Sequence, residues 1–176
     1  NPNKIHPIEP PAAPPGQPHQ PVTCATSPRC PHVIQSDYEL GSVLKPLSIA
    51  AAMDAGVVTS MSKLYDASKP LVIEGHKIHD DHALDRWIDV PETLVHSSNI
   101  ATSRIADEMG AARLQAAYRR FGFDSRVAVN LPGAANPIWP RRWDRLTTMT
   151  AAFGQGIAMT PLHLAIAYAA LVNGGI

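Results

Sequence analysis

The chain has 176 residues, of which 45% are hydrophobic, and its lysines and arginines balance its acidic residues to a net charge of zero. A chain of this length can bury one substantial core, so one or two domains are expected. The balanced charge argues against nucleic acid as a partner. The longest apolar stretches of the sequence are interrupted by polar side chains, and none is long enough to cross a bilayer.

Proline is concentrated at the start of the chain, where eleven of the 17 prolines lie at or before Pro46. The run from Pro7 to Pro31 mixes proline with Ala, Gly, Gln and His. This composition favours extended polyproline segments, which build no packed core. We therefore predict an exposed Pro-rich insertion or linker over residues 1–36 and a folded domain over residues 37–176. A role of the first segment as a ligand for a proline-recognition domain stays open.

Two cysteines, Cys24 and Cys30, lie in the Pro-rich segment, with His19 and His32 nearby. A zinc site would need all four side chains at tetrahedral reach, and their spacing matches no standard zinc motif. In an oxidising compartment a small disulfide-closed loop is favoured. We rank a disulfide first, two free thiols second and a metal site third.

The first candidate catalytic pair is Ser42 and Lys45, three residues apart at the start of an apolar helical pattern. Residues at i and i+3 share a helix face, and a lysine base can activate a serine nucleophile. Because proline is tolerated only in the first turn, Pro46 predicts a helix that begins just before it and stops at Gly56. Free N–H groups there favour a developing oxyanion, but the local pattern fits an N-cap serine equally well.

The same spacing recurs at Ser60 and Lys63, without a proline in the following turn, so context rather than spacing singles out Ser42. A second motif follows in S-S-N at residues 97–99. The sequence V-P-E at residues 90–92 predicts a helix start. The pattern is interrupted at S-S-N and resumes from Ile100 to a stop at Gly110. This corner would present a hydroxyl and a carboxamide, or it would simply be a capped break between helices.

Taken together, these segments resemble the class B penicillin-binding proteins, the peptidoglycan D,D-transpeptidases. Y-E-L-G-S-V-L-K-P at residues 38–46 looks like the active-site segment of that family, and V-H-S-S-N-I-A-T-S-R-I-A at residues 95–106 resembles its S-x-N motif. Residues 152–175 are similar to a helix of the family and its Asn-Gly-Gly exit. The septal cell-division type is most similar. The resemblance implies a multi-domain α and β protein with the transpeptidase and serine β-lactamase-like fold. This chain would be mainly the α-helical half, with small hairpins.

The resemblance also implies roles for the motif residues. Ser42 would be the acylated nucleophile, Lys45 its base, Ser97 the relay of the proton to the leaving amine, and Asn99 a contact to the peptide backbone. The substrate would be the D-Ala-D-Ala end of a peptidoglycan stem peptide, and β-lactam antibiotics would acylate the same serine. No cofactor or metal is implied. Lysine serves as the base only if its pKa is lowered by burial or by neighbouring charge.

The third motif of the family, K-[ST]-G, does not occur in these 176 residues. In the family it lies on a strand that supplies one of the two oxyanion-hole N–H groups. We therefore expect a partial transpeptidase domain that is incomplete and inactive by itself. The resemblance further implies a place on the periplasmic face of the bacterial inner membrane, with an anchoring segment that is not in this chain. The division or elongation machinery would be the protein partner.

Three other functions stay open. A β-lactamase or D,D-carboxypeptidase would pass the acyl group to water, although the E-x-x-L-N motif of class A β-lactamases is absent. A non-catalytic penicillin-binding or sensor module is the second. The third is a metal-dependent hydrolase built on the cluster His79-Asp80-Asp81-His82. Against it, residues 71–78 predict a hairpin that turns at E-G and leaves the cluster solvated at its exit.

Near the end of the chain, Thr160 and the proline after it predict a capped helix that runs through Leu171. Its apolar positions form one face, which we predict to be core: Leu164, Ala167, Tyr168 and Leu171. Upstream, Trp139 and Trp143 could rim a groove or pack against the domain, and the sequence does not decide between these alternatives.

Overall fold

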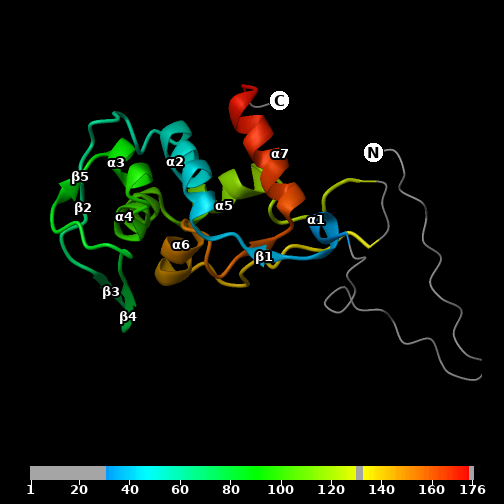
Figure 1. The fold of residues 1–176 in the computed structure, drawn as a ribbon, viewed down its shortest axis with the longest axis horizontal. Coiled ribbons are helices and arrows are strands. Elements are labelled where there is room, and N and C mark those ends of the chain that lie inside the picture. Colours follow the sequence, from blue (N-terminus) through cyan, green and yellow to red (C-terminus); the bar gives the residue numbers. More distant parts are fainter. Residues whose placement is uncertain (1–30, 130–132, 175–176) are drawn as a thin grey trace, which may run out of the picture. The chain divides into compact units, whose positions relative to one another are not determined.

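The computed structural model describes residues 31–129 and 133–174 (Figure 1). The folded unit begins at Pro31 and is mainly helical. Most of the Pro-rich segment, including Cys24 and Cys30, lies outside the described residues, so the predictions for it stay predictions. The helices are α1 (His32–Gln35), the 3-10 helix η2 (Gly41–Leu44), α2 (Lys45–Asp54), α3 (Val90–Val95), α4 (Asn99–Met109), α5 (Ala111–Arg120), α6 (Arg145–Ala151) and α7 (Pro161–Val172).

The strands form three short antiparallel pairs within the described residues: β1 (Tyr38–Glu39) with β6 (Ala158–Met159), β2 (Tyr65–Asp66) with β5 (Trp87–Ile88), and β3 (Leu71–Ile73) with β4 (His76–Ile78). The last pair is the predicted hairpin. Its turn lies at Glu74 and Gly75, where both residues have positive φ, as tight hairpin turns require. The other two pairs join segments that are distant in sequence.

The segment that carries the first motif is helical throughout. Residues Gly41–Leu44 form the 3-10 turn, and the α-helix continues from Lys45 with Pro46 in its first turn. The predicted helix start is therefore confirmed, and the helix ends before Gly56, whose φ is +68°. α2 packs against α4, α5 and α7, and its buried apolar residues, together with Leu44 of η2, form the centre of the main core: Leu47, Ile49, Ala51 and Ala52.

The predicted break between two helices at the second motif is also confirmed. Asp89 and Glu92 form a reciprocal capping box at the start of α3. Ser98 caps α4, its Oγ accepting the N–H of Ala101 at 3.0 Å. α4 begins at Asn99, one residue earlier than the hydrophobic pattern indicates, because a cap at Ser98 makes the next residue the first helical one.

The start of α7 follows the prediction, with Thr160 as N-cap in a capping box with His163. The predicted core face is only partly correct. Ala167 is buried, whereas Leu171 is 38% exposed, and Ile166 and Val172, on other sides of the helix, are exposed as well. α7 is apolar around its circumference but packs on α1 and α2 along one side, so part of its apolar surface faces solvent. No helix among the described residues is long and apolar enough to span a membrane.

Trp139 and Trp143 pack together, with ring centroids 4.9 Å apart. Trp143 also meets the buried ring of Tyr118 edge-on at 6.3 Å, and the guanidinium of Arg119 lies 5.7 Å from the centroid of the Trp139 ring. Both tryptophans are partly buried against the main core. The packing alternative is therefore the one that the structure adopts.

A turn from the C-terminal part of the chain holds the segment before Ser42. Gly41 N–H donates to Gly154 O at 3.2 Å, and Gly156 N–H donates to the Glu39 carboxylate at 2.9 Å. Gly154 has φ of +83°, and a Cβ built on it would lie 2.3 Å from the carbonyl oxygen of Gly41. No real Cβ approaches backbone so closely, so only glycine fits at this position.

We predict that Gly154→Ala destabilises the protein by at least about 2 kcal/mol more than Gly56→Ala does, since overpacking against backbone adds to the strain of positive φ. Gly56 is a matched control because its φ is +68° and nothing lies within 4 Å of a Cβ there. Thermal or denaturant unfolding of the full-length protein measures both losses. Equal losses of stability in the two variants would show that the turn at Gly154 is not packed closely against the backbone before Ser42.

Candidate active site

Ser42 lies exposed on the 3-10 turn at the amino end of the helical segment. The N–H of Lys45 donates to the carbonyl oxygen of Ser42. In such an i→i+3 turn the side chains three residues apart are eclipsed, so Ser42 and Lys45 share a face, as predicted. The N-cap positions of η2 and α2 are Leu40 and Leu44, and neither helix has a side-chain cap. The interpretation of Ser42 as an N-cap serine is therefore wrong.

Lys45 is buried, with only 1% of its surface exposed. Its Nζ donates to the carbonyl oxygen of Ser97 and, at 2.9 Å, to Ser97 Oγ. Burial lowers the pKa of Lys45 to about 8, against the opposing pull of the carboxylates of Asp80 and Asp81. At pH 7 roughly one in ten lysines with such a pKa is unprotonated. The first two motifs thus meet through a lysine that gains and loses its proton near neutral pH.

Ser97 occupies an unusual backbone conformation, with φ of +51° at the corner between α3 and α4. A non-glycine residue with positive φ stores strain that the surroundings must hold in place, and such residues gather at functional sites. Ser97 N–H donates to Leu94 O at 3.1 Å, and the next N–H, of Ser98, donates to Thr93 O at 2.9 Å. This corner turns both the carbonyl and the hydroxyl of Ser97 towards Lys45.

Asn99 begins α4, and its carboxamide Nδ2 donates to the carbonyl oxygen of His79 at 3.0 Å. No hydrogen bond from the described residues reaches its Oδ1. Half-buried at the edge of the corner, the side chain is fixed by the hairpin exit and keeps an acceptor oxygen available. Of the sequence-predicted residues, Lys45 and Ser97 are therefore in direct contact, Ser42 lies on the same helical face as Lys45, and Asn99 follows Ser97 at the α3–α4 corner.

Asp80 is a site residue that the sequence does not reveal. We expected the cluster at the hairpin exit to be solvated, and for Asp80 this is wrong. Its carboxylate accepts the Ser98 hydroxyl at 2.7 Å and the Ile100 N–H at 2.9 Å. A negative charge is stabilised at a helix amino end, so Asp80 joins the hairpin to α4. The sequence signal is no more than an Asp-rich run, because its partners lie 18 and 20 residues away.

Ser48 is a second residue that the sequence does not single out. Its Oγ lies 2.7 Å from the hydroxyl of Tyr118 and donates to the carbonyl oxygen of Ala152 at 2.6 Å. Tyr118 in turn donates to Ala151 O at 3.1 Å. All these groups are buried, so the network ties α2 to α5 and to the end of α6. It fixes the helix that carries Lys45.

The second Ser-x-x-Lys spacing forms no comparable pair. Ser60 and Ser62 are exposed and hydrogen-bonded to each other at 2.8 Å. Lys63 instead pairs with the carboxylate of Glu108 and donates to Val57 O at 2.8 Å. The Lys63 amine is thus held by other groups, and the choice of Ser42 over Ser60 stays a prediction.

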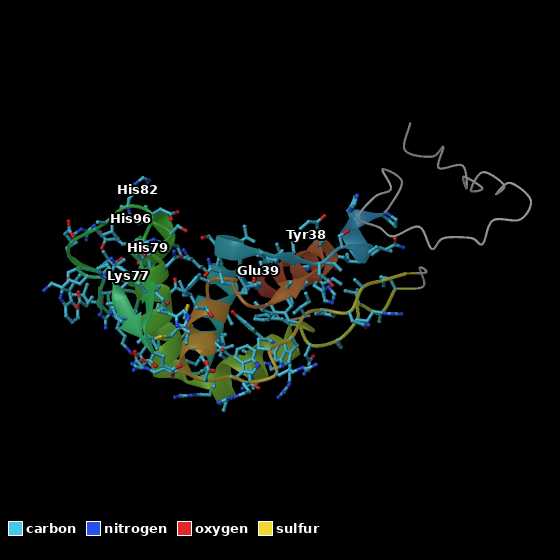
Figure 2. All side chains as sticks on the ribbon, turned by 90° about the horizontal axis from the view of Figure 1, so that it is seen from below. Tyr38, Glu39, Lys77, His79, His82 and His96 are labelled. Atoms are coloured by element: carbon cyan, nitrogen blue, oxygen red, sulfur yellow. The ribbon has the colours of Figure 1, made fainter. Side chains whose placement is uncertain are left out.

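Nothing in the described part of the chain supports the metal-hydrolase alternative. Between residues 31 and 174, leaving out 130–132, no group of three or more His, Cys, Asp or Glu side chains could hold a metal ion. His79 and His82 are exposed, and Asp80 is engaged with α4. Figure 2 shows His79, His82 and His96 at the same end of the described unit as Lys77.

The family model of the penicillin-binding protein transpeptidase domain matches residues 12–176. The chain belongs to the penicillin-binding protein transpeptidase family. It is 39% identical over 140 residues to a probable peptidoglycan D,D-transpeptidase FtsI of Caulobacter vibrioides, covering 80% of this chain and 24% of the relative. It is 34% identical over 143 residues to peptidoglycan D,D-transpeptidase FtsI of Escherichia coli K12, a match that covers 79% of this chain and 24% of that relative. The chain thus spans about a quarter of the curated relatives it matches.

Solved structures of the family have the same fold. The transpeptidase domain of penicillin-binding protein 3 from Burkholderia pseudomallei matches with a TM-score of 0.75 at 30% identity, over 82% of this chain and 44% of that one. A protein described as a peptidoglycan glycosyltransferase from Burkholderia ambifaria matches with a TM-score of 0.76 at 27% identity, over 84% and 46%. The predicted fold class is confirmed, and the helical part with its small strand pairs is the part that this chain supplies.

We predict that Asp80→Ala lowers the free energy of unfolding by about 2–3 kcal/mol, because two donors at the start of α4 lose a charged acceptor. Asp81→Ala is the matched control, since Asp81 is exposed and makes no hydrogen bond among the described residues. Asp81→Ala should lower the free energy of unfolding by no more than about 0.5 kcal/mol. Chemical denaturation of both full-length variants makes the comparison. Similar stability of the two variants would contradict a role for Asp80 in fixing the corner.

Proposed function

We propose that the protein is a serine D,D-transpeptidase that crosslinks peptidoglycan stem peptides through an acyl-enzyme on Ser42. The observation that carries the proposal is the buried amine of Lys45, which has a pKa of about 8, lies on the same helix face as Ser42 and is hydrogen-bonded to Ser97. Membership of the transpeptidase family and relatives named peptidoglycan D,D-transpeptidase support the reaction class.

In the proposed acylation, neutral Lys45 takes the proton of Ser42 Oγ as this oxygen attacks the carbonyl carbon of the penultimate D-Ala. The free N–H groups at the amino end of the helical segment favour the resulting oxyanion. The proton passes from Lys45 through Ser97 Oγ to the leaving amine, and the terminal D-Ala departs. Asn99 accepts a hydrogen bond from the peptide backbone through Oδ1.

In the proposed second step, an amine from another stem peptide attacks the ester carbonyl on Ser42. A proton of that amine passes back along Ser97 and Lys45 to Ser42 Oγ as the ester bond breaks. One peptide bond is lost and one is formed, so the reaction needs no cofactor. A β-lactam enters the same first step, and its opened ring stays attached because no leaving group departs.

The stem peptide lies outside the cytoplasmic membrane, so we place the protein on the periplasmic face of the bacterial inner membrane. The division machinery is the proposed protein partner, and the similarity to relatives named FtsI supports it. A septal role would be tested by localising a fluorescent fusion of the full-length protein, which should gather at the division site.

Ser42→Ala should abolish covalent labelling of the full-length protein by a fluorescent penicillin, because Ser42 is the exposed hydroxyl one turn before the buried Lys45, whereas Ser48, one turn after it, is itself buried and donates to Ala152 O. Ser60→Ala is the matched control at the second Ser-x-x-Lys spacing and should label normally. Gel fluorescence and peptide mapping identify the labelled residue. Labelling that survives Ser42→Ala would show that Ser42 is not the nucleophile. Release of acyl groups to water without crosslinks would point to a D,D-carboxypeptidase.

Lys45→Arg should slow acylation by orders of magnitude, because a guanidinium stays protonated and offers no base. Lys63→Arg is the control and should acylate normally. In the parent, the acylation rate constant should rise as the pH passes through about 8, since only the neutral amine accepts a proton. Asp80→Asn removes a charge that raises the pKa of Lys45, so the midpoint should move to lower pH. A midpoint that stays fixed would show that Lys45 does not set the profile.

A further inference from the structure

One side chain joins β1 to the turn after α6, and the mechanism proposed above gives it no role. Glu39 is exposed on β1, three residues before Ser42, and its carboxylate accepts the N–H of Gly156 at 2.9 Å. Figure 2 shows Tyr38 and Glu39 following one another along this strand. The two bonded residues are 117 positions apart in the chain. A side chain just before the serine segment therefore holds a turn from a distant part of the sequence.

The turn itself comprises residues 153–156. The N–H groups of residues 153–155 return to carbonyl oxygens at the end of α6, at 3.0 to 3.2 Å. The next N–H, of Gly156, goes to Glu39 instead. A carboxylate is a stronger acceptor for a backbone N–H than a neutral oxygen is. The turn is thus bound at one end to its own helix and at the other to β1.

Between its two ends, the turn contacts the peptide group that joins Gly41 and Ser42. Gly41 N–H donates to Gly154 O at 3.2 Å. The carbonyl oxygen of Gly41 lies against the backbone of Gly154, only 2.3 Å from the place that a Cβ would take. In a trans peptide the C=O and the N–H point in opposite directions. Because the carbonyl of this peptide faces the turn, the N–H of Ser42 points away from it.

The direction of the Ser42 N–H matters for the proposed acylation. Within residues 31–129 and 133–174 this N–H donates to no other group, as is usual for the first N–H groups of a helix. The oxyanion forms on the carbon that Ser42 Oγ attacks, so a donor on the same residue is within reach of it. Such a donor stabilises the oxyanion only if it is already aimed at the place where the charge develops.

We propose that Glu39 is a positioning residue that aims the N–H of Ser42 at the oxyanion. Its carboxylate holds Gly156, which keeps Gly154 against Gly41, and this contact fixes the plane of the peptide that carries the Ser42 N–H. Glu39 itself binds no reacting atom. The inference rests on the proposed function and adds to it the origin of the geometry of one oxyanion donor.

Three substitutions in the full-length protein separate the reach of Glu39 from its charge. Glu39→Gln keeps the length and an acceptor oxygen, Glu39→Asp keeps the charge but is one methylene too short for Gly156, and Glu39→Ala removes both. The Asp and Ala variants should be acylated by fluorescent penicillin about tenfold more slowly, less than the roughly hundredfold loss for a deleted donor. The Gln variant should react at nearly the parental rate. The noncovalent dissociation constant, measured by rapid mixing over a range of penicillin concentrations, should not change.

The carbonyl stretch of the acyl-enzyme provides a second measurement, by infrared difference spectroscopy. A hydrogen bond to the ester oxygen lowers this frequency, so the band should move to higher wavenumber and broaden in Glu39→Ala but not in Glu39→Gln. Tyr38→Ala is the matched control, since Tyr38 is the exposed neighbour on β1 and its hydroxyl makes no hydrogen bond in the described ranges. A lower folded fraction reduces the amount of labelled protein but does not shift the band.

A parental rate and band in Glu39→Ala would overturn the inference, and so would a change confined to penicillin binding. A carboxylate that acts only through its charge opposes the oxyanion, so faster acylation of both the Gln and the Ala variant would overturn it as well. Hydrogen exchange followed by mass spectrometry tests the contact without any reaction. The amides of Gly41 and Gly156 should exchange faster in the Ala and Asp variants than in the parent and the Gln variant.

The two proposals fail in different ways. A parent protein that penicillin does not acylate would contradict the proposed function, whatever the exchange of these two amides shows. Equal exchange in the parent and the three variants would show that Glu39 does not hold the turn, even where Ser42 is acylated normally.

Discussion

The candidate site is organised around one buried amine, that of Lys45. An ammonium group removed from water loses hydration free energy, and this loss lowers its pKa to about 8. The carbonyl and hydroxyl of Ser97 accept its protons, and the carboxylates of Asp80 and Asp81 oppose the shift. The balance leaves a lysine that changes protonation near neutral pH, which a proton-transfer group requires.

Segments that are distant in sequence hold Lys45 and Ser97 in this arrangement. On one side, Asp80 binds the start of α4 and fixes the corner at which Ser97 has positive φ. On the other, the hydroxyl of Ser48 ties α2 to residues near the end of α6. Gly154 then brings the following turn against the backbone before Ser42. Each contact is a hydrogen bond or a close approach of backbone, which loses its effect if displaced by an ångström or so.

The β3–β4 hairpin connects the groups of the candidate site with the surface around them. The chain leaving it supplies Asp80 to α4 and a carbonyl oxygen, that of His79, to Asn99. The hairpin also places Ile78 in a buried cluster with Phe153. The same element therefore holds the corner of the site and packs against the segment that follows α6.

The sequence by itself determined the features that arise within one or two helical turns. Pro46 marked the helix that carries Ser42 and Lys45, S-S-N marked the break before α4, and the Glu74-Gly75 turn gave the hairpin. These predictions are correct because helix capping, the steric limits of proline and turns with positive φ act between residues that are close in the chain.

Only the tertiary structure decided the role of Asp80, the lowered pKa of Lys45, the need for glycine at 154 and the exposure of Leu171. Each depends on burial or on a partner tens of residues away, which local spacing does not encode.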